Sequence, residues 1–131
     1  MKLLRNLFTL LLGSPAASRP APAVMTLKPS GDKEWRNNDC QFHREDGPAI
    51  QYANGDKAWY QNGLLHRDDG PALEYANGDT YWYREGRLHR EDGPAVEVHD
   101  FQAWYLRGQL LTEREIVVLQ ECAKERSLRE R

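Results

Sequence analysis

The stretch NGDKAWYQNGLLHRDDGPA, residues 54–72, contains two turn signals on either side of a tryptophan. Asn54-Gly55 and Asn62-Gly63 are dipeptides that favour two-residue type I′ turns, because both residues of such a turn need a positive φ. The residues around Asn54-Gly55 alternate between apolar and polar, as they do in a strand with one buried face. The stretch therefore predicts successive β-hairpins, with Trp59 in the strand between the turns.

The same pattern recurs along the chain with a period of 23 residues. The recurring positions are His43, His66 and His89, then Gly47, Gly70 and Gly93, and finally Trp59, Trp82 and Trp104, the last of them one residue early. Going backward, SGDKEW (30–35) matches NGDKAW, so a degenerate copy begins near Val24. A period of this size indicates stacked supersecondary units whose end copies are atypical.

Hairpin register follows from the turns. A two-residue turn at Asn54-Gly55 places Tyr52 opposite Lys57, Gln51 opposite Ala58 and Ile50 opposite Trp59. Alternation then puts Ile50, Tyr52 and Trp59 on one face of the sheet. In the last unit, Val96, Val98 and Trp104 take these places if the loop His99-Asp100-Phe101 has three residues. The sheet is expected to carry a stripe of tryptophans on one face.

The histidine of HRxDGPA has a structural and a chemical interpretation. Counting across Asn62-Gly63 sets Trp59 opposite His66, so the histidine is expected to be a cross-strand neighbour of the tryptophan. Each unit offers one histidine with one or two carboxylates, which is fewer ligands than zinc takes. We therefore predict structural histidines, no metal, no cofactor and no catalytic residue, with ion pairs from Arg44, Arg67 and Arg90 to nearby acids. A His/Asp metal-dependent hydrolase is the chemical alternative.

Residues 1–23 have two interpretations. A basic start, an apolar run and Ala21-Pro22-Ala23 before Val24 fit a secretory signal peptide, which implies export. The same residues also form an amphipathic pattern with Leu4, Leu7, Phe8 and Leu11 on its apolar side. A retained short helix of this kind packs on a partner or on a membrane surface, and implies a cytoplasmic or assembly-associated protein. A Pro/Ala/Ser linker follows in both cases.

The C-terminal segment, residues 112–131, is expected to form a helix. Thr112-Glu113-Arg114-Glu115 fits a capping box, and the helix is expected to run to about Leu128. We expect this helix to pack over the last repeats as a cap. The alternative is that it docks on another protein. Cys40 and Cys122 are far apart in sequence, and they are interpreted either as one disulfide or as two thiols.

Composition bounds the class of protein. The chain has 131 residues, enough for one small domain, and its formal net charge is −2. The first 30 residues carry four basic residues and no acid, so the remainder is acidic. No nucleic-acid-binding motif or basic patch accompanies it, and nucleic acid is not expected as a partner.

The unit Tyr-x-Asn-Gly-Asp-x-x-Trp-Tyr-x-x-Gly-x-x-His-Arg-x-Asp-Gly-Pro-Ala resembles MORN-type repeats over residues 31–108. It is more similar to the variant MORN-like repeats of bacterial and bacteriophage proteins, including those labelled YwqK-family antitoxins. Asp-Gly-Pro-Ala stands where that family has Gly-x-Gly. The resemblance implies a single-layer antiparallel sheet that acts as a scaffold.

The predicted architecture is all-β, with three to four hairpin repeats over residues 24–111, a C-terminal capping helix and a short N-terminal helix if residues 1–23 are retained. The predicted function is a non-enzymatic protein–protein interaction module or small scaffold, antitoxin-like or part of a larger assembly. The partner is a protein or a second copy of the chain. Candidate contact residues in the sheet are Tyr60, Tyr83 and Tyr105. The alternative is a membrane-peripheral protein held by residues 1–12.

Overall fold

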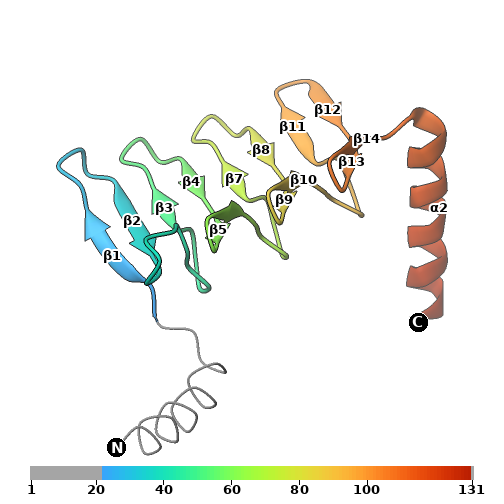
Figure 1. Ribbon diagram of the computed structural model, residues 1–131. Helices are drawn as coiled ribbons and strands as arrows, with labels where there is room; N and C mark the ends of the chain where they lie inside the picture. Colours follow the sequence, from blue (N-terminus) through green and yellow to red (C-terminus); the bar gives the residue numbers. More distant parts are fainter. Residues whose placement is uncertain (1–21, 131) are drawn as a thin grey trace, which may run out of the picture.

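The structure is a computed structural model that describes residues 22–130, an open array of antiparallel strands followed by one helix (Figure 1). Its main element is an eight-stranded sheet in the order β1-β2-β3-β4-β7-β8-β11-β12. These strands are β1 (Val24–Leu27), β2 (Lys33–Arg36), β3 (Ile50–Gln51), β4 (Lys57–Ala58), β7 (Leu73–Glu74), β8 (Thr80–Tyr81), β11 (Val96–Val98) and β12 (Phe101–Ala103). The predicted all-β array of antiparallel hairpins is confirmed.

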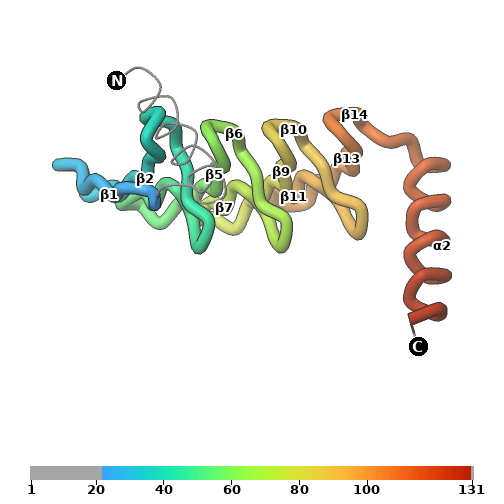
Figure 2. Tube along the Cα trace, turned by 60° about the horizontal axis from the view of Figure 1, so that its bottom comes forward, coloured from blue at the N-terminus to red at the C-terminus, as the bar shows by residue number. Residues whose placement is uncertain are grey.

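Three further two-stranded sheets form a row along the array (Figure 2). They are β5 (Tyr60–Gln61) with β6 (Leu64–Leu65), β9 (Tyr83–Arg84) with β10 (Arg87–Leu88), and β13 (Tyr105–Leu106) with β14 (Gln109–Leu110). The chain crosses from the large sheet to each small one at a tryptophan: Trp59, Trp82 and Trp104. Each repeat therefore contributes two strands to the large sheet and one small hairpin.

The turn at Asn54-Gly55 differs from the sequence prediction. Tyr52 N–H donates to Asp56 O, Gly55 N–H donates to Tyr52 O, and only Gly55 of the dipeptide has a positive φ, 98°. This is the three-residue hairpin loop in which a turn is followed by a left-handed glycine. The reason is local: Asn54 Oδ1 accepts from the Asp56 N–H (3.0 Å), which holds Asn54 out of the left-handed region.

The longer loop moves the register by one residue. Ile50 pairs with Ala58 and Gln51 with Lys57, so the predicted pairs of Ile50 with Trp59, Gln51 with Ala58 and Tyr52 with Lys57 are wrong. Ile50 and Ala58 share the buried side, with 4% and 1% of their surfaces exposed. Because the face of each side chain follows the register, the predicted stripe of Ile50, Tyr52 and Trp59 on one face is wrong as well.

The last hairpin is tighter than predicted. Val98 pairs with Phe101, so the loop consists of His99 and Asp100 alone, and His99 has a φ of 48°. Phe101 is therefore the first residue of β12 and not part of the loop. The missing loop residue accounts for the early arrival of Trp104.

The tight turn predicted at Asn62-Gly63 forms, and two equivalent turns follow it in the next repeats. The residue before the glycine and the glycine itself both have positive φ in Asn62-Gly63 (49° and 81°), Glu85-Gly86 (51° and 78°) and Arg107-Gly108 (50° and 81°). These are type I′ turns. Tyr60 pairs with Leu65, and the His66 N–H donates to Trp59 O at 3.1 Å. The predicted neighbourhood of tryptophan and histidine is confirmed.

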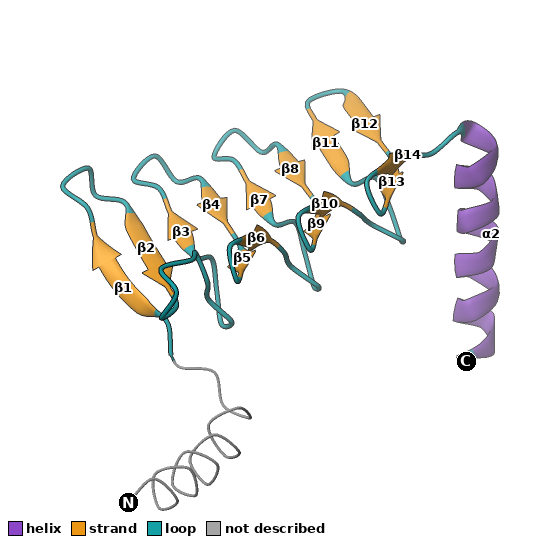
Figure 3. Cartoon of the chain, viewed as in Figure 1, coloured by secondary structure: helices purple, strands orange, loops and turns teal. Residues whose placement is uncertain are grey.

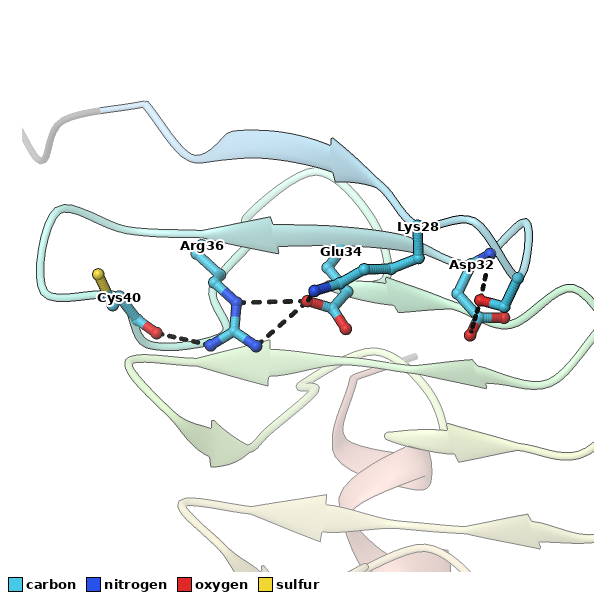
Figure 4. Close-up of polar contacts among 6 residues, drawn as sticks. Lys28, Asp32, Glu34, Arg36 and Cys40 are labelled. Atoms are coloured by element: carbon cyan, nitrogen blue, oxygen red, sulfur yellow. Dashed lines mark hydrogen bonds and ion pairs between the residues drawn. The ribbon is translucent and has the colours of Figure 1, made fainter.

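The first repeat is irregular in the part that follows β2. Residues 37–41 form a longer loop, Cys40 has a φ of 61°, and a single bridge joins Arg36 to Phe42. The Arg36 guanidinium donates to Cys40 O (2.8 Å) and to Glu34 (3.2 Å) (Figure 4). It also lies 3.9 Å from the Phe42 ring centroid. These contacts of Arg36 hold the loop where the other repeats have a type I′ hairpin.

The buried core is thin and made of small residues. Ala49, Ala72 and Ala95 are fully buried, and among the described residues no large side chain is completely enclosed. The tryptophans are half-buried. Since so little apolar surface is buried within a repeat, hydrogen bonds between repeats carry an unusual share of the specificity of the array.

Helix α2 (Glu113–Arg129) begins with the predicted capping box. The Thr112 hydroxyl accepts from Glu115 N–H, and the Glu115 carboxylate accepts from the Thr112 N–H at 2.8 Å. The helix stands away from the end of the sheet (Figure 3), and none of its 17 residues is buried. The predicted packing of this helix over the last repeats is wrong: Ile116 and Leu119 are only partly covered, and every other residue of the helix is exposed.

Candidate functional site

The histidine of each HRxDGPA segment holds the next repeat in place. His43 Nδ1 accepts from the Asn62 N–H, and the same atom of the following histidines accepts from Glu85 and Arg107, at 3.0 Å in all three cases. Each acceptor bond ends on a residue of a type I′ turn one repeat further along. Because Nδ1 accepts, the neutral ring carries its proton on Nε2.

The arginine that follows each histidine stacks on a tryptophan. The Arg67 guanidinium lies 4.0 Å from the Trp59 ring centroid and donates to Asp69 (3.1 Å), Pro71 O (3.0 Å) and Glu74 (2.8 Å). Arg44 over Trp35 and Arg90 over Trp82 repeat the stack at 3.9 and 4.0 Å. The predicted ion pairs of these arginines are confirmed.

The glycine of each HRxDGPA segment leaves room for the same arginine. A Cβ on Gly70 would lie 2.7 Å from Arg67 Cζ, and the corresponding distances at Gly47 and Gly93 are 2.9 and 2.7 Å. None of these glycines has a positive φ. A side chain at these positions would therefore displace the stacked guanidinium, whereas the backbone conformation itself does not call for glycine.

A second connection between repeats was not predicted from the sequence. Asp32 Oδ1 accepts from the Ala53 N–H (2.7 Å), and Asp56 and Asp79 accept in the same way from Ala76 (2.8 Å) and His99 (3.2 Å). Each bond joins one loop of the large sheet to the next. The signal in the sequence is the aspartate that follows the glycine at 32, 56 and 79 and is missing at 101.

Electrostatics favour these contacts. The hydrogen bond and the charge of Arg44 hold the pKa of Asp46 below its ordinary value. The Ser30 hydroxyl and the Ala53 N–H lower the pKa of Asp32 in the same direction. Burial lowers the pKa of His89, and the Arg84 charge adds to that effect. His89 is therefore held neutral, in the form that accepts from the next turn.

The exposed groups of the HRxDGPA segments line a row of clefts. The first, of about 400 Å³, is lined by Trp35, His43 and Arg44 among others. The second, about 670 Å³, lies between the first two segments and includes Trp59 and Arg67. The third, about 240 Å³, includes Trp82. The carboxylates on the rims, Glu45, Asp46, Asp68, Asp69, Glu91 and Asp92, are all exposed.

The predicted contact residues Tyr60, Tyr83 and Tyr105 lie in the small hairpins and are half-buried. The Tyr60 ring lies 5.3 Å from that of Phe42, and burial raises the pKa of Tyr60 and of Tyr83. Each tyrosine also accepts, through its backbone oxygen, from the arginine of the preceding HRxDGPA segment. The three tyrosines are thus part of the contact between neighbouring repeats, and each remains partly exposed.

The remaining sequence predictions concern other regions. Leu4, Leu7, Phe8 and Leu11 lie outside the described residues. Cys40 and Cys122 are both exposed and are not joined to each other. Among residues 22–130, no three His, Cys, Asp or Glu side chains are grouped so that they could hold a metal ion, and no helix is long and apolar enough to cross a membrane.

Comparison of the chain with models of known protein families, with characterised proteins and with solved structures found no match.

Proposed function

We propose that the protein is a non-enzymatic interaction module that binds an extended segment of a protein partner along the row of clefts. The observation that carries this proposal is the repetition: a cleft with a tryptophan, an arginine and rim carboxylates occurs three times in one line. The resemblance to MORN-like repeats favours the same class of function. A toxin, a second copy of the chain or a component of a larger assembly are the partners that it implies.

The spacing of the clefts fits an extended peptide. Each repeat adds two strands of about 4.8 Å to the large sheet, so neighbouring clefts lie about 10 Å apart. A peptide in the extended polyproline II conformation advances about 3.1 Å per residue with three residues per turn, so every third side chain points the same way and meets the next cleft. Because the rims carry carboxylates, basic side chains at this interval are the expected ligands.

The histidines support binding rather than catalysis. A general base needs a ring nitrogen that is free to take a proton from a substrate. Nδ1 of His43, His66 and His89 is already occupied by the next turn, and Nε2 faces an acid at 3.8, 3.1 and 3.6 Å. The bonds at Nδ1 give each histidine a structural role that requires no reaction.

Capture of partners from the native source tests the proposal. The first variant replaces Glu45, Asp68 and Glu91 by lysine, since these rim side chains are 65%, 74% and 57% exposed and are not the acids that pair with the stacked arginines Arg44, Arg67 and Arg90. The matched control replaces the exposed Glu121 and Glu125 of α2 by lysine. We expect the rim variant to lose the captured protein and the helix variant to keep it. Equal capture by both variants contradicts binding in the clefts.

A further inference from the structure

We propose that the outer edge of β1 pairs with β1 of a second copy, which makes the protein a two-fold symmetric dimer with one continuous sheet. β1 lies at the outer end of the sheet (Figures 1 and 4). Among residues 22–130, no strand pairs with its far side. This inference does not depend on what binds in the clefts.

The edge of β1 presents backbone groups in a known direction. Trp35 N–H donates to Ala49 O (2.8 Å) and Trp35 O accepts from His43 N–H (3.0 Å), so both backbone groups of Trp35 point away from β1. Met25 pairs with Trp35. In an antiparallel ladder the two residues of a pair either bond to each other or both face outward. The N–H and C=O of Met25, and of Leu27 two residues later, therefore face the open edge.

The side chains of β1 lack the usual protection of an edge strand. Val24, Met25 and Leu27 are 65%, 48% and 62% exposed, and β1 contains neither a charge nor a proline. With four residues, β1 and β2 are also the longest strands of the sheet. Natural proteins interrupt exposed edges with charges, prolines or bulges, so an apolar, regular edge indicates a surface that is covered by another strand.

A second copy of β1 can form hydrogen bonds with all the outward backbone groups of β1 in one register. With Thr26 opposite Thr26 of the second copy, Met25 lies opposite Leu27 of the other chain and Leu27 opposite its Met25. All four outward backbone groups of each strand then form hydrogen bonds, and Lys28 lies opposite Val24 with no like charge facing it. The two threonines meet at the two-fold axis in a non-hydrogen-bonded pair, a favourable cross-strand pair.

Head-to-tail stacking of copies is disfavoured by the two ends of the array. At the C-terminal end Phe101 stands where Asp32, Asp56 and Asp79 accept from the next repeat. At the N-terminal end Pro29 occupies the position of Ala53, whose N–H makes that bond, and proline has no N–H. The chain therefore lacks both partners of the inter-repeat bond at an end-to-end junction, and β1–β1 pairing closes as a dimer.

Sedimentation of the full chain at micromolar to millimolar concentration tests the dimer. We expect a monomer–dimer equilibrium without larger species. Met25→Lys with Leu27→Lys places lysine opposite lysine twice and should leave only monomer. Met25→Lys with Leu27→Glu places lysine opposite glutamate twice and should keep the dimer. Phe101→Lys, on the opposite edge, is the matched control and should dimerise like the natural chain.

The outcomes separate the alternatives. A natural chain that is monomeric throughout overturns the proposal, as would be the case if residues 1–21 or another protein covered the edge. Identical behaviour of the two β1 variants overturns the register. Loss of dimer in Phe101→Lys places the contact at the other edge and also overturns the proposal. Circular dichroism and tryptophan fluorescence verify that each variant is folded.

Cross-linking checks the symmetry axis. In a background of Cys40→Ser and Cys122→Ser, Thr26→Cys should give a disulfide-linked dimer, since Cα atoms of a non-hydrogen-bonded pair lie about 4.5 Å apart, within disulfide range. Val24→Cys is the control. Residue 24 lies opposite residue 28 of the second copy, four residues away from residue 24 of that copy, so the two cysteines cannot reach each other. Cross-linking by both variants, or by neither, contradicts the proposed axis.

Discussion

The middle repeats and the last repeat have the same order of strands and hairpins but differ in the side chains that face the next repeat. Asp56, His66 and Arg67 all bind groups that belong to the following strands or turns. At the same places the last repeat has Phe101, Leu111 and Thr112. Leu111 N–H still donates to Trp104 O at 2.8 Å, as His66 N–H does to Trp59 O. The local hairpin therefore survives without these side chains.

The difference shows what the repeated motif is for. A side chain that is needed within a repeat would be present in every copy, including the last. Aspartate, histidine and arginine are present only where another repeat follows. In a stacked array, stability is a sum of terms within units and between neighbours. The motif HRxDGPA belongs to the terms between neighbours, and Thr112 is left to begin helix α2.

Substitution of the tryptophans is expected to give the largest difference in stability between a middle repeat and the last repeat. We expect Trp59→Ala to lower the free energy of unfolding by about 3 kcal/mol, in line with removal of a large aromatic from a packed site. Trp104→Ala should cost roughly half as much, because among the described residues no guanidinium lies over its ring as Arg67 lies over Trp59. Urea unfolding followed by far-ultraviolet circular dichroism measures both. Equal costs would mean that neighbouring repeats do not reinforce each other.

Arginine substitution sharpens the comparison at a smaller scale. Arg67→Lys keeps the charge but loses the planar stack on Trp59 and the fork that binds Asp69, Pro71 and Glu74, so it should cost on the order of 1–2 kcal/mol. Arg107→Lys, an exposed arginine in the last repeat, should change stability by less than about 0.5 kcal/mol. The same urea experiment applies. A cost at position 107 as large as that at 67 would refute a special role for the stacked arginine.

The sequence determines some turns and not others. Asn62-Gly63 and Asn54-Gly55 contain the same dipeptide, yet only the first forms the predicted type I′ turn. Asp56 follows Asn54-Gly55, and its carboxylate accepts a hydrogen bond from the N–H of Ala76 in the next repeat. That long-range bond adds to the local bond between Asn54 and Asp56 that widens the loop, and counting residues within one hairpin could not reveal either bond. A leucine follows Asn62-Gly63, so nothing competes with the tight turn there.

The candidate site was predictable to a similar degree. The neighbourhood of His66 and Trp59 followed from the register of a single hairpin. The bond from the Glu85 N–H to His66 Nδ1 depends on how far apart two repeats lie, which no local pattern states. The prediction that helix α2 packs over the last repeats was wrong for the same reason. Its amphipathic pattern predicts a helix, but the surface available to cover it is a property of the whole array.

Acidification should act on the middle repeats through histidine. Burial lowers the pKa of folded His89, so between about pH 7 and pH 5 the unfolded chain takes up its proton first and stability falls with pH. Protonation also removes the acceptor for Arg107 N–H. His89→Asn offers an amide oxygen as a non-titrating acceptor, and its unfolding midpoint should fall less over this range. Parallel pH profiles for the two chains would contradict a neutral, accepting His89.

A substitution at the start of helix α2 is expected to have the smallest effect on the stability of the strand array. Thr112→Ala removes the capping box, which should cost the helix about 1 kcal/mol and lower its circular dichroism signal. All four tryptophans lie in the strand array, so their fluorescence reports the array alone. Because no residue of α2 is buried, the fluorescence midpoint in urea should not move. A shift of that midpoint would mean that the helix stabilises the last repeat in solution. The last repeat would then be held by the helix in the way that each middle repeat is held by the repeat that follows it.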